Sequence, residues 1–438
     1  MHNRRSFIRK SSLVSVGLGA SLLFPMELLA TMRKKVGAND QINVGLIGCN
    51  GMGFSDLTSM LKISEVNVLA LCDVDESVLK KRTVQLEKAG IKKPLWYRDY
   101  RNLLANKDID VVIIGTPDHW HCLQLIDALT SGKDVYCEKP IANSIEEANI
   151  MLNFVNSSDR IVQIGQWQRS QPHFVDAINF VHSGKLGQIR LAKAWAYQGW
   201  MNPIPVKPNT TTPEGVDYKM WLGPALNRDF NPNRFHFNFR WFWDYAGGLM
   251  TDWGVHLIDY ALYGMKAGAP KSVMALGGKF AYPNDASETP DTLQTVFEYD
   301  NFSLLWEHAT GIDGGNYGRN HGIAFIGNNG TLVLDRNGWE VIAEKNRMES
   351  LPIQKNQGSG LDLHTKNFIN AVKNREGGSL NAPIQVGYDA ALVSHMGNVA
   401  YKTGNKVHWD KVNKQFKSDA ANAFIKAEYH NGWKLPRL

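Results

Sequence analysis

The sequence predicts an α/β domain with a parallel sheet, followed by an α+β domain with a large, open, mainly antiparallel sheet. Strand-like and helix-like segments alternate up to about residue 165, which is the pattern of a parallel sheet with crossover helices. Beyond that point strand-like runs follow one another, as they do in antiparallel sheets. The length of 438 residues also exceeds one ordinary domain.

Composition narrows the class of protein. A hydrophobic fraction of 43% and a charged fraction of 21% are typical of a folded globular chain. The net charge of +6 is modest, and no basic stripe with interleaved aromatics occurs, so we expect no nucleic-acid partner. The cysteines lack metal-ligand spacing, which predicts buried reduced thiols and no metal site. They are Cys49, Cys72, Cys122 and Cys137.

Residues 1–31 are predicted to be an export signal. Arg4 and Arg5 lie in a basic segment, and an apolar stretch over 13–24 follows that is short and rich in glycine and serine. This arrangement resembles a twin-arginine signal, which exports folded proteins. We therefore expect a periplasmic protein with no stable membrane span after processing. The alternatives are a membrane anchor formed by an uncleaved signal, and a cytoplasmic protein.

The first domain is predicted over residues 41–165. Ile42–Ile47 is strand-like and leads into a glycine-rich turn before a helix, the arrangement that brings backbone N–H groups to a pyrophosphate. Asp73 ends the next strand, twenty positions after Gly53, where a carboxylate can accept from ribose hydroxyls and repels a 2′-phosphate. This predicts a Rossmann fold that binds NAD rather than NADP. The predicted turn residues are Gly48, Asn50, Gly51, Met52 and Gly53.

Asn50 stands where the G-x-G-x-x-G pattern has its second glycine. Asparagine tolerates positive φ better than most residues and Gly51 follows it, so the turn remains buildable. The side chain of Asn50 leaves open how closely the turn can approach the pyrophosphate.

Two further apolar strands, Val111–Ile114 and Asp134–Cys137, end in polar residues. Ligands of such sheets lie beyond the carboxyl ends of the strands. An ammonium at Lys139, wedged before a proline, could polarise a substrate oxygen; the alternative is a solvated loop lysine. The histidines that follow the first of these strands are expected either to cap the next helix or to contact ligand. The residues predicted around this crevice are Thr116, Pro117, His119, His121, Glu138 and Lys139.

The second domain is predicted over 166–362, with helices over 363–438 packing back on the first. Its expected strands are 188–197, 271–279, 292–299, 303–308, 321–326, 331–334 and 339–343. The region 195–243 is dense in Trp, Phe, Asn, Arg and His, which suits stacking on sugar rings and hydrogen bonds to hydroxyls, or else an aromatic core. The candidate sugar contacts are Trp195, Trp200, Arg240, Trp243, His308 and Arg319.

Asp252 and His256 are separated by four positions. On one helix they would lie on the same face, and a histidine there could take a proton from a substrate hydroxyl. The alternative is a solvated aspartate beside a buried structural histidine.

The order of glycine turn, Asp73, Thr116-Pro117, Glu138-Lys139-Pro140 and Asp252-x-x-x-His256 resembles the Gfo/Idh/MocA oxidoreductase family from about residue 42 to the C-terminus. The resemblance implies a tightly bound nicotinamide cofactor, a sugar or cyclitol substrate, and a homodimer or homotetramer formed through the open sheet. It also implies two sets of residues. The catalytic set is Lys139, Asp252 and His256, and the NAD-binding set is Gly48, Gly51, Gly53, Asp73, Thr116 and Pro117.

These expectations combine into an NAD-dependent oxidoreductase acting on a secondary hydroxyl of a sugar, glycoside or cyclitol. One alternative is an NAD-dependent glycoside-cleaving enzyme that works through a transient keto sugar and elimination. Another is a non-catalytic sugar-binding protein, against which the intact Lys139, Asp252 and His256 argue.

Overall fold

The computed structural model describes residue 37 and residues 41–437. The predicted export signal lies outside these residues. Within them, no helix combines the length and apolar character needed to cross a bilayer.

The first sheet is parallel, with strand order β3-β2-β1-β4-β5-β6. This order places β1 and β4 side by side at the centre, where the direction of winding reverses and ligands of such sheets bind. The strands are β1 Ile42–Ile47, β2 Val66–Cys72, β3 Leu95–Tyr97, β4 Val111–Ile114, β5 Asp134–Cys137 and β6 Val162–Ile164.

Local sequence explains where the helices of this domain begin. The carboxylates of Asp75 and Asp99 accept from backbone N–H groups at the starts of α4 and α5. Ser144 accepts from the N–H of Glu147 at 3.1 Å at the start of α7, as in a capping box. The helices are α3 Gly51–Met60, α4 Glu76–Lys88, α5 Tyr100–Ala105, α6 Asp118–Thr130 and α7 Ile145–Asn156.

The second sheet has ten strands in the order β14-β13-β12-β11-β7-β10-β9-β8-β15-β16. All its pairings are antiparallel except β7 with β10, so the predicted fold class is confirmed. The sequence patterns did not indicate β14, β15 and β16. The strands are β7 Ile189–Gln198, β8 Ser272–Gly278, β9 Thr292–Glu298, β10 Ser303–Thr310, β11 His321–Gly327, β12 Gly330–Asp335, β13 Gly338–Ala343, β14 Leu351–Lys355, β15 Val407–Asp410 and β16 Gln415–Phe416.

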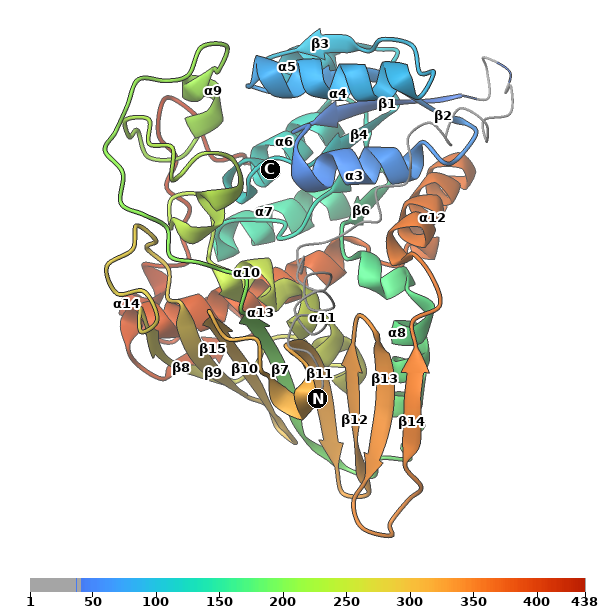
Figure 1. Ribbon diagram of the computed structural model, residues 1–438, viewed down its shortest axis with the longest axis vertical. Coiled ribbons are helices and arrows are strands. Elements are labelled where there is room, and N and C mark those ends of the chain that lie inside the picture. The colour runs from blue at the N-terminus through green and yellow to red at the C-terminus, as the bar shows by residue number, and fades with distance from the viewer. Residues whose placement is uncertain (1–36, 38–40, 438) are drawn as a thin grey trace, which may run out of the picture.

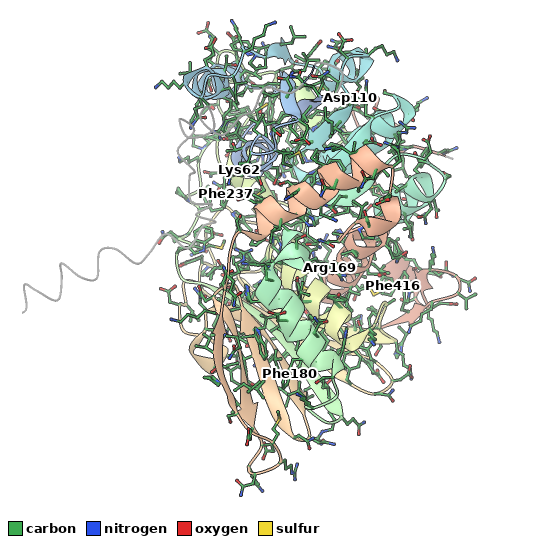
Figure 2. All side chains as sticks on the ribbon, turned by 90° about the vertical axis from the view of Figure 1, so that its right-hand side faces the viewer. Lys62, Asp110, Arg169, Phe180, Phe237 and Phe416 are labelled. Carbon is green, nitrogen blue, oxygen red and sulfur yellow. The ribbon has the colours of Figure 1, made fainter. Side chains whose placement is uncertain are left out.

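Helices cover one face of the second sheet and join it to the first domain (Figure 1). The long helix α13 contacts α7 of the first domain as well as α11 and β8. Helix α12 contacts α3, where Lys62 Nζ meets Asp362 at 2.8 Å, and Arg169 forms an ion pair with Asp259 of α11 at 2.6 Å (Figure 2). These helices are α8 Pro172–His182, α10 Leu249–Asp252, α11 Gly254–Met265, α12 Gly360–Asn374, α13 Ile384–Thr403 and α14 Asp419–Asn422.

The long connection from 199 to 248 leaves the second sheet and reaches the first domain. The backbone N–H of Asp217 donates to Val74 O at 2.9 Å, and His236 Nε2 lies 2.9 Å from the Asp75 carboxylate. This connection therefore packs beside the end of β2, next to Asp73. The short helices of the described chain are α9 Tyr218–Leu222, η2 Trp167–Ser170, η3 His236–Trp241, η4 Asn316–Gly318 and η5 Gly377–Ser379.

Candidate active site

The glycine turn between β1 and α3 allows three backbone segments to approach closely. Gly48 has a φ of +83°, and a Cβ there would lie 2.6 Å from the carbonyl carbon of Gly115 at the end of β4. A Cβ on Gly53 would lie 2.3 Å from Gly48 O. Asn50 makes no side-chain cap to α3, so the N-terminal N–H groups of this helix stay available to an anion. The turn therefore fits the pyrophosphate of a dinucleotide.

Asn50 itself has extended backbone, with φ −97° and ψ 166°, whereas Gly51 has the positive φ of +48°. The missing second glycine thus imposes no backbone strain on the turn. Arg82, which the sequence patterns did not single out, fixes this loop because its guanidinium donates to Cys49 O at 2.9 Å and to Asn50 Oδ1 at 3.1 Å. The Asp73 carboxylate accepts from the N–H of Cys49 at 2.8 Å, so it braces the turn as well as ending β2.

Residues after β4 line the same edge of the sheet. Thr116 Oγ1 donates to Gln124 at 2.7 Å, and Pro117 precedes α6. Neither histidine caps α6, so that expectation was wrong, and contact with a ligand stays a prediction. His121 bridges Pro140 O at 2.7 Å and Thr116 O at 2.8 Å. His119 is buried against the aromatic rings of the long connection, with Nε2 3.1 Å from Trp221 O.

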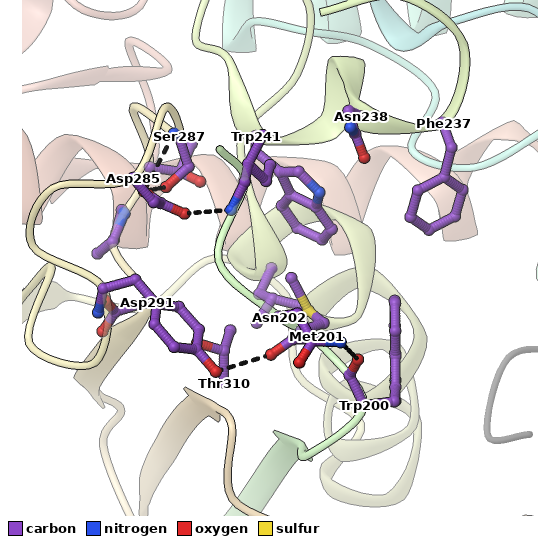
Figure 3. A pocket seen from close by; sticks show the side chains of 15 residues that line it. Trp200, Met201, Asn202, Phe237, Asn238, Trp241, Asp285, Ser287, Asp291 and Thr310 are labelled. Atoms are coloured by element: carbon purple, nitrogen blue, oxygen red, sulfur yellow. Dashed lines mark hydrogen bonds between the residues drawn. The ribbon is translucent and has the colours of Figure 1, made fainter. Parts of the chain in front are cut away.

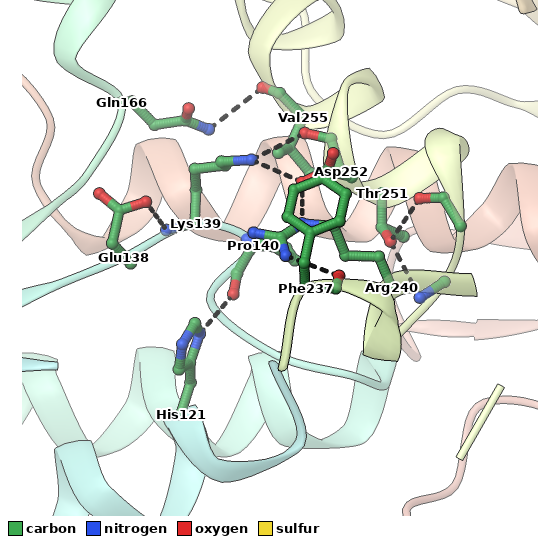
Figure 4. A network of polar contacts seen from close by, with 12 residues as sticks. His121, Glu138, Lys139, Pro140, Gln166, Phe237, Arg240, Thr251, Asp252 and Val255 are labelled. Carbon is green, nitrogen blue, oxygen red and sulfur yellow. Dashed lines mark hydrogen bonds and ion pairs between the residues drawn. The ribbon is translucent and has the colours of Figure 1, made fainter. Parts of the chain in front are cut away.

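Lys139 is the centre of a polar network at the carboxyl end of β5 (Figure 4). Its Nζ donates to Asp252 Oδ1 and to Asp252 O, both at 3.0 Å. Arg240 Nε donates to the same Oδ1 at 3.2 Å. Burial alone would raise the pKa of Asp252, but the charges of Lys139 and Arg240 lower it to about 2. An ammonium has three donors, so one N–H of Lys139 remains for a substrate oxygen.

Asp252 and His256 do not share a continuous helix, which corrects the sequence-based interpretation. Helix α10 ends at Asp252 and α11 begins at Gly254. The N–H of His256 bonds to Trp253 O at 3.1 Å, and the Asp252 carbonyl accepts from Lys139 instead. Among the described residues, Asp252 makes no hydrogen bond to His256. Asp252 therefore bonds to Lys139 through its carboxylate and its carbonyl, and it is not paired with the His256 imidazole.

His256 is buried, and its pKa lies well below the usual value because burial and the nearby charges of Lys139 and Arg336 disfavour the imidazolium. A neutral imidazole can accept a proton. His321 contacts the Trp253 ring at 5.0 Å, and the Arg336 guanidinium lies over the same indole at 4.7 Å. Neither His321 nor Arg336 was predicted as a site residue, because each lies in an ordinary strand or hairpin segment.

Two buried carboxyl groups beside Lys139 have pKa values raised to neutral pH or above it. Burial raises the pKa of Glu138 to about 7. Burial likewise raises the pKa of Asp118 to about 8, since Arg240 and Lys139 offset it only in part and Asp252 adds to it. Asp118 is thus mainly neutral in the folded protein at pH values where an unfolded aspartate is ionised.

We expect the raised pKa of Asp118 to lower the free energy of unfolding as the pH rises. Between about pH 4 and pH 8 the folded state binds a proton that the unfolded chain has released, so the free energy of unfolding falls with increasing pH. Asp118→Asn removes the titration but keeps the shape. The midpoint of urea unfolding should therefore fall less in the variant than in the wild type between about pH 5 and pH 8. Parallel curves for the two proteins would contradict a raised pKa at Asp118.

Two of the candidate sugar contacts lie near this network. Arg240 belongs to it directly. Trp200 lines an open hollow together with Phe237 and Trp241 (Figure 3), and the Phe237 ring lies 4.7 Å from the Arg240 guanidinium. The hollow therefore adjoins the Lys139 network.

Three of the other candidates, Trp195, His308 and Arg319, are buried with structural partners, which contradicts their assignment as sugar contacts. For the fourth, Trp243, the assignment stays a prediction. Trp195 is fully buried and donates from Nε1 to Arg319 O at 2.7 Å. His308 is buried with Nε2 3.1 Å from Pro290 O, and Arg319 pairs with Asp335 at 3.1 Å and with Glu340 at 2.5 Å. Trp243 lines a different hollow, beneath the Lys402 ammonium. The side chains of Trp195, His308 and Arg319 therefore contribute to packing and pairing inside the second domain.

A glycine turn shaped for a pyrophosphate, beside a lysine, a carboxylate and a neutral histidine, is the arrangement expected of a nicotinamide-binding oxidoreductase fold. The chain belongs to the Gfo/Idh/MocA oxidoreductase family: residues 42–166 match its NAD-binding Rossmann fold, and residues 192–435 match its C-terminal alpha/beta domain. NAD is accordingly the cofactor.

Curated relatives match over part of the chain. An alpha-N-acetylgalactosaminidase of Shewanella oneidensis is 27% identical over 209 residues, which is 43% of this chain and 45% of that protein. A glycosyl hydrolase family 109 protein of Shewanella baltica is 27% identical over 206 residues, with the same coverage. The match thus spans less than half the length of these relatives.

Solved structures share the fold. A levoglucosan dehydrogenase in complex with NADH and levoglucosan has a TM-score of 0.63 at 20% identity, covering 84% of this chain and 99% of that one. An aldose-aldose oxidoreductase from Caulobacter crescentus has a TM-score of 0.62 at 18% identity, with 84% and 99% covered.

Proposed function

We propose that the protein oxidises or reduces a secondary hydroxyl of a sugar, glycoside or cyclitol by hydride transfer with tightly bound NAD. The observation that carries the proposal is the ammonium of Lys139, held at 3.0 Å from Asp252 at the carboxyl end of β5, near a buried neutral His256. Sugars named for two fold relatives, levoglucosan and aldose, support the choice of substrate class.

Different residues would bind the cofactor, take the proton and stabilise the alkoxide. Gly48, Gly53 and the start of α3 would hold the pyrophosphate of NAD. When bound, the nicotinamide ring supplies the hydride acceptor. His256 takes the proton of the substrate hydroxyl, and the remaining N–H of Lys139 stabilises the developing alkoxide. Asp252, kept ionised by two cations, orients Lys139 rather than His256.

A second candidate function is glycoside cleavage without net redox change. The alpha-N-acetylgalactosaminidase among the relatives favours it. A transient keto sugar has an acidified neighbouring C–H, so it can lose that proton and its glycosidic substituent to form a double bond. Water then adds to the double bond, and return of the hydride reduces the carbonyl again. Both functions need the same proton transfer by His256 and the same support by Lys139, and they differ in the product released.

Absorbance at about 340 nm, the nicotinamide band, tests both candidates. We expect the purified protein, loaded with NAD, to gain absorbance when one sugar of a panel is added. A lasting increase indicates dehydrogenation. Release of 4-nitrophenol from 4-nitrophenyl N-acetyl-α-D-galactosaminide without a lasting increase indicates the glycosidase. If NAD is bound and neither signal appears, both candidate functions are wrong.

We also propose that the open face of the second sheet forms a homodimer or homotetramer. Met274 and Val296 are paired across β8 and β9 on that face and are 49% and 42% exposed, and Leu276 is 72% exposed. Exposed apolar surface of this kind supports an interface.

We also propose that the segment 1–31 exports the protein to the periplasm or anchors it in the membrane. The doublet Arg4-Arg5 supports this proposal.

A further inference from the structure

Three nitrogen atoms without partners surround Trp253, the residue that follows Asp252. They are His256 Nδ1, His321 Nε2 and Arg336 Nε, each buried and without a hydrogen bond to any described group. Buried polar groups are ordinarily paired in folded proteins. A cluster of unpaired ones beside a catalytic lysine therefore indicates that a bound molecule supplies the partners.

Arg336 is the charged member of the cluster. Its guanidinium lies over the indoles of Trp253, at 4.7 Å, and Trp167, at 5.2 Å, and it forms no ion pair with a described carboxylate. The two rings offset part of the cost of burying the charge. Burial lowers the pKa of Arg336 only to about 10, so it is a cation at neutral pH. Its donors lie in the plane of the guanidinium and remain available.

The charges around the site do not balance. Lys139, Arg240 and Arg336 are cations, whereas Asp252 is ionised and Glu138, with a pKa of about 7, is ionised in part. Asp118 is mainly protonated at neutral pH, because burial raises its pKa to about 8. This excess of positive charge favours an anionic ligand.

His321 adds a second element of recognition. Its Nδ1 lies 2.7 Å from Asn320 Oδ1, an acceptor, so Nδ1 carries the hydrogen. Burial lowers the pKa of His321 to about 3, so the ring is neutral. Nε2 is therefore an acceptor, suited to a hydroxyl rather than to a carboxylate.

We propose that Arg336 binds the carboxylate of an acidic sugar and that His321 accepts from a neighbouring hydroxyl, so that the substrate is a hexuronate or a glycoside of one. The inference rests on the proposed function and specifies its substrate. A planar guanidinium matches a carboxylate with two parallel hydrogen bonds, and the flanking indoles fix the plane in which the carboxylate must lie.

Matched substrate pairs test the proposal on the full chain loaded with NAD. We expect D-glucuronate to have a higher kcat/KM than D-glucose, and D-galacturonate a higher one than D-galactose, from absorbance at about 340 nm. Arg336→Gln should lower the ratio of acid to neutral sugar by on the order of thirtyfold, as loss of a charged hydrogen bond does. Arg336→Lys should lower it less, because the charge remains. Arg190→Gln, at an exposed position, is the matched control and should leave the ratio unchanged.

The outcomes separate this inference from the proposed function. Three outcomes would overturn the inference and leave the proposed function standing. They are turnover of neutral sugars without preference for acids, an equal effect of Arg336→Gln on acidic and neutral sugars, and a preference for D-glucose 6-phosphate. Calorimetric binding of D-glucuronate that depends on Arg336 but yields no NADH would support the inference and overturn the dehydrogenase. If the acids neither bind nor react, the inference is wrong.

Discussion

Replacing Lys139 by methionine is expected to lower kcat by about a thousandfold while NAD remains bound. The change removes the N–H that stabilises the developing alkoxide, and preorganised donors of this kind contribute about a hundredfold to a thousandfold each. It also leaves the Asp252 carboxylate with Arg240 as its one remaining cationic partner in the network. Single-turnover reduction of NAD, followed with the best sugar of the panel, measures the loss.

Lys92→Met is the matched control, because Lys92 is exposed on the first domain. It should keep the wild-type rate. Fluorescence titration with NADH should give similar affinities for both variants, since the lysine at 139 acts on the substrate oxygen. A Lys139→Met protein with wild-type kcat would remove Lys139 from the mechanism.

Replacing His256 by alanine is expected to lower kcat/KM by at least about a hundredfold, the usual size of a lost general base. The pKa of His256 lies well below its ordinary value because burial and the charges of Lys139 and Arg336 disfavour the protonated form. The wild-type imidazole therefore stays neutral, and able to accept a proton, as the pH falls through 6.5, the ordinary histidine value.

The pH profile tests this assignment separately from the size of the loss. The pKa of Glu138 is about 7, so the profile is measured in Glu138→Gln, where kcat/KM should show no inflection near the ordinary histidine pKa of about 6.5. His408→Ala, at an exposed position on β15, serves as the control and should retain activity. Full activity of His256→Ala would show that another group takes the proton, and an inflection near about 6.5 in Glu138→Gln would contradict the lowered pKa of His256.

The sequence was sufficient for the parts of the molecule that depend on local chemistry. Alternating apolar segments and the glycine turn identified the first domain, and successive strand patterns identified the second. Lys139 was found because a strand ends just before it, and parallel strands bring their carboxyl ends to one edge. These features follow from side-chain periodicity and turn geometry, which are properties of neighbouring residues.

Only the tertiary structure decided which polar side chains meet. Asp252 and His256 have helical spacing, but the helix breaks at Trp253, and the Asp252 carbonyl accepts from Lys139, a partner over a hundred positions away. Trp195 and His308 looked like sugar contacts by composition and are buried, since density of aromatic residues along the chain does not reveal which face of a strand is covered. His321 reaches Trp253 from β11 and Arg336 reaches it from the turn between β12 and β13, and no local pattern encodes that approach. Burial and long-range packing set the charge of these groups, and therefore the chemistry of the site.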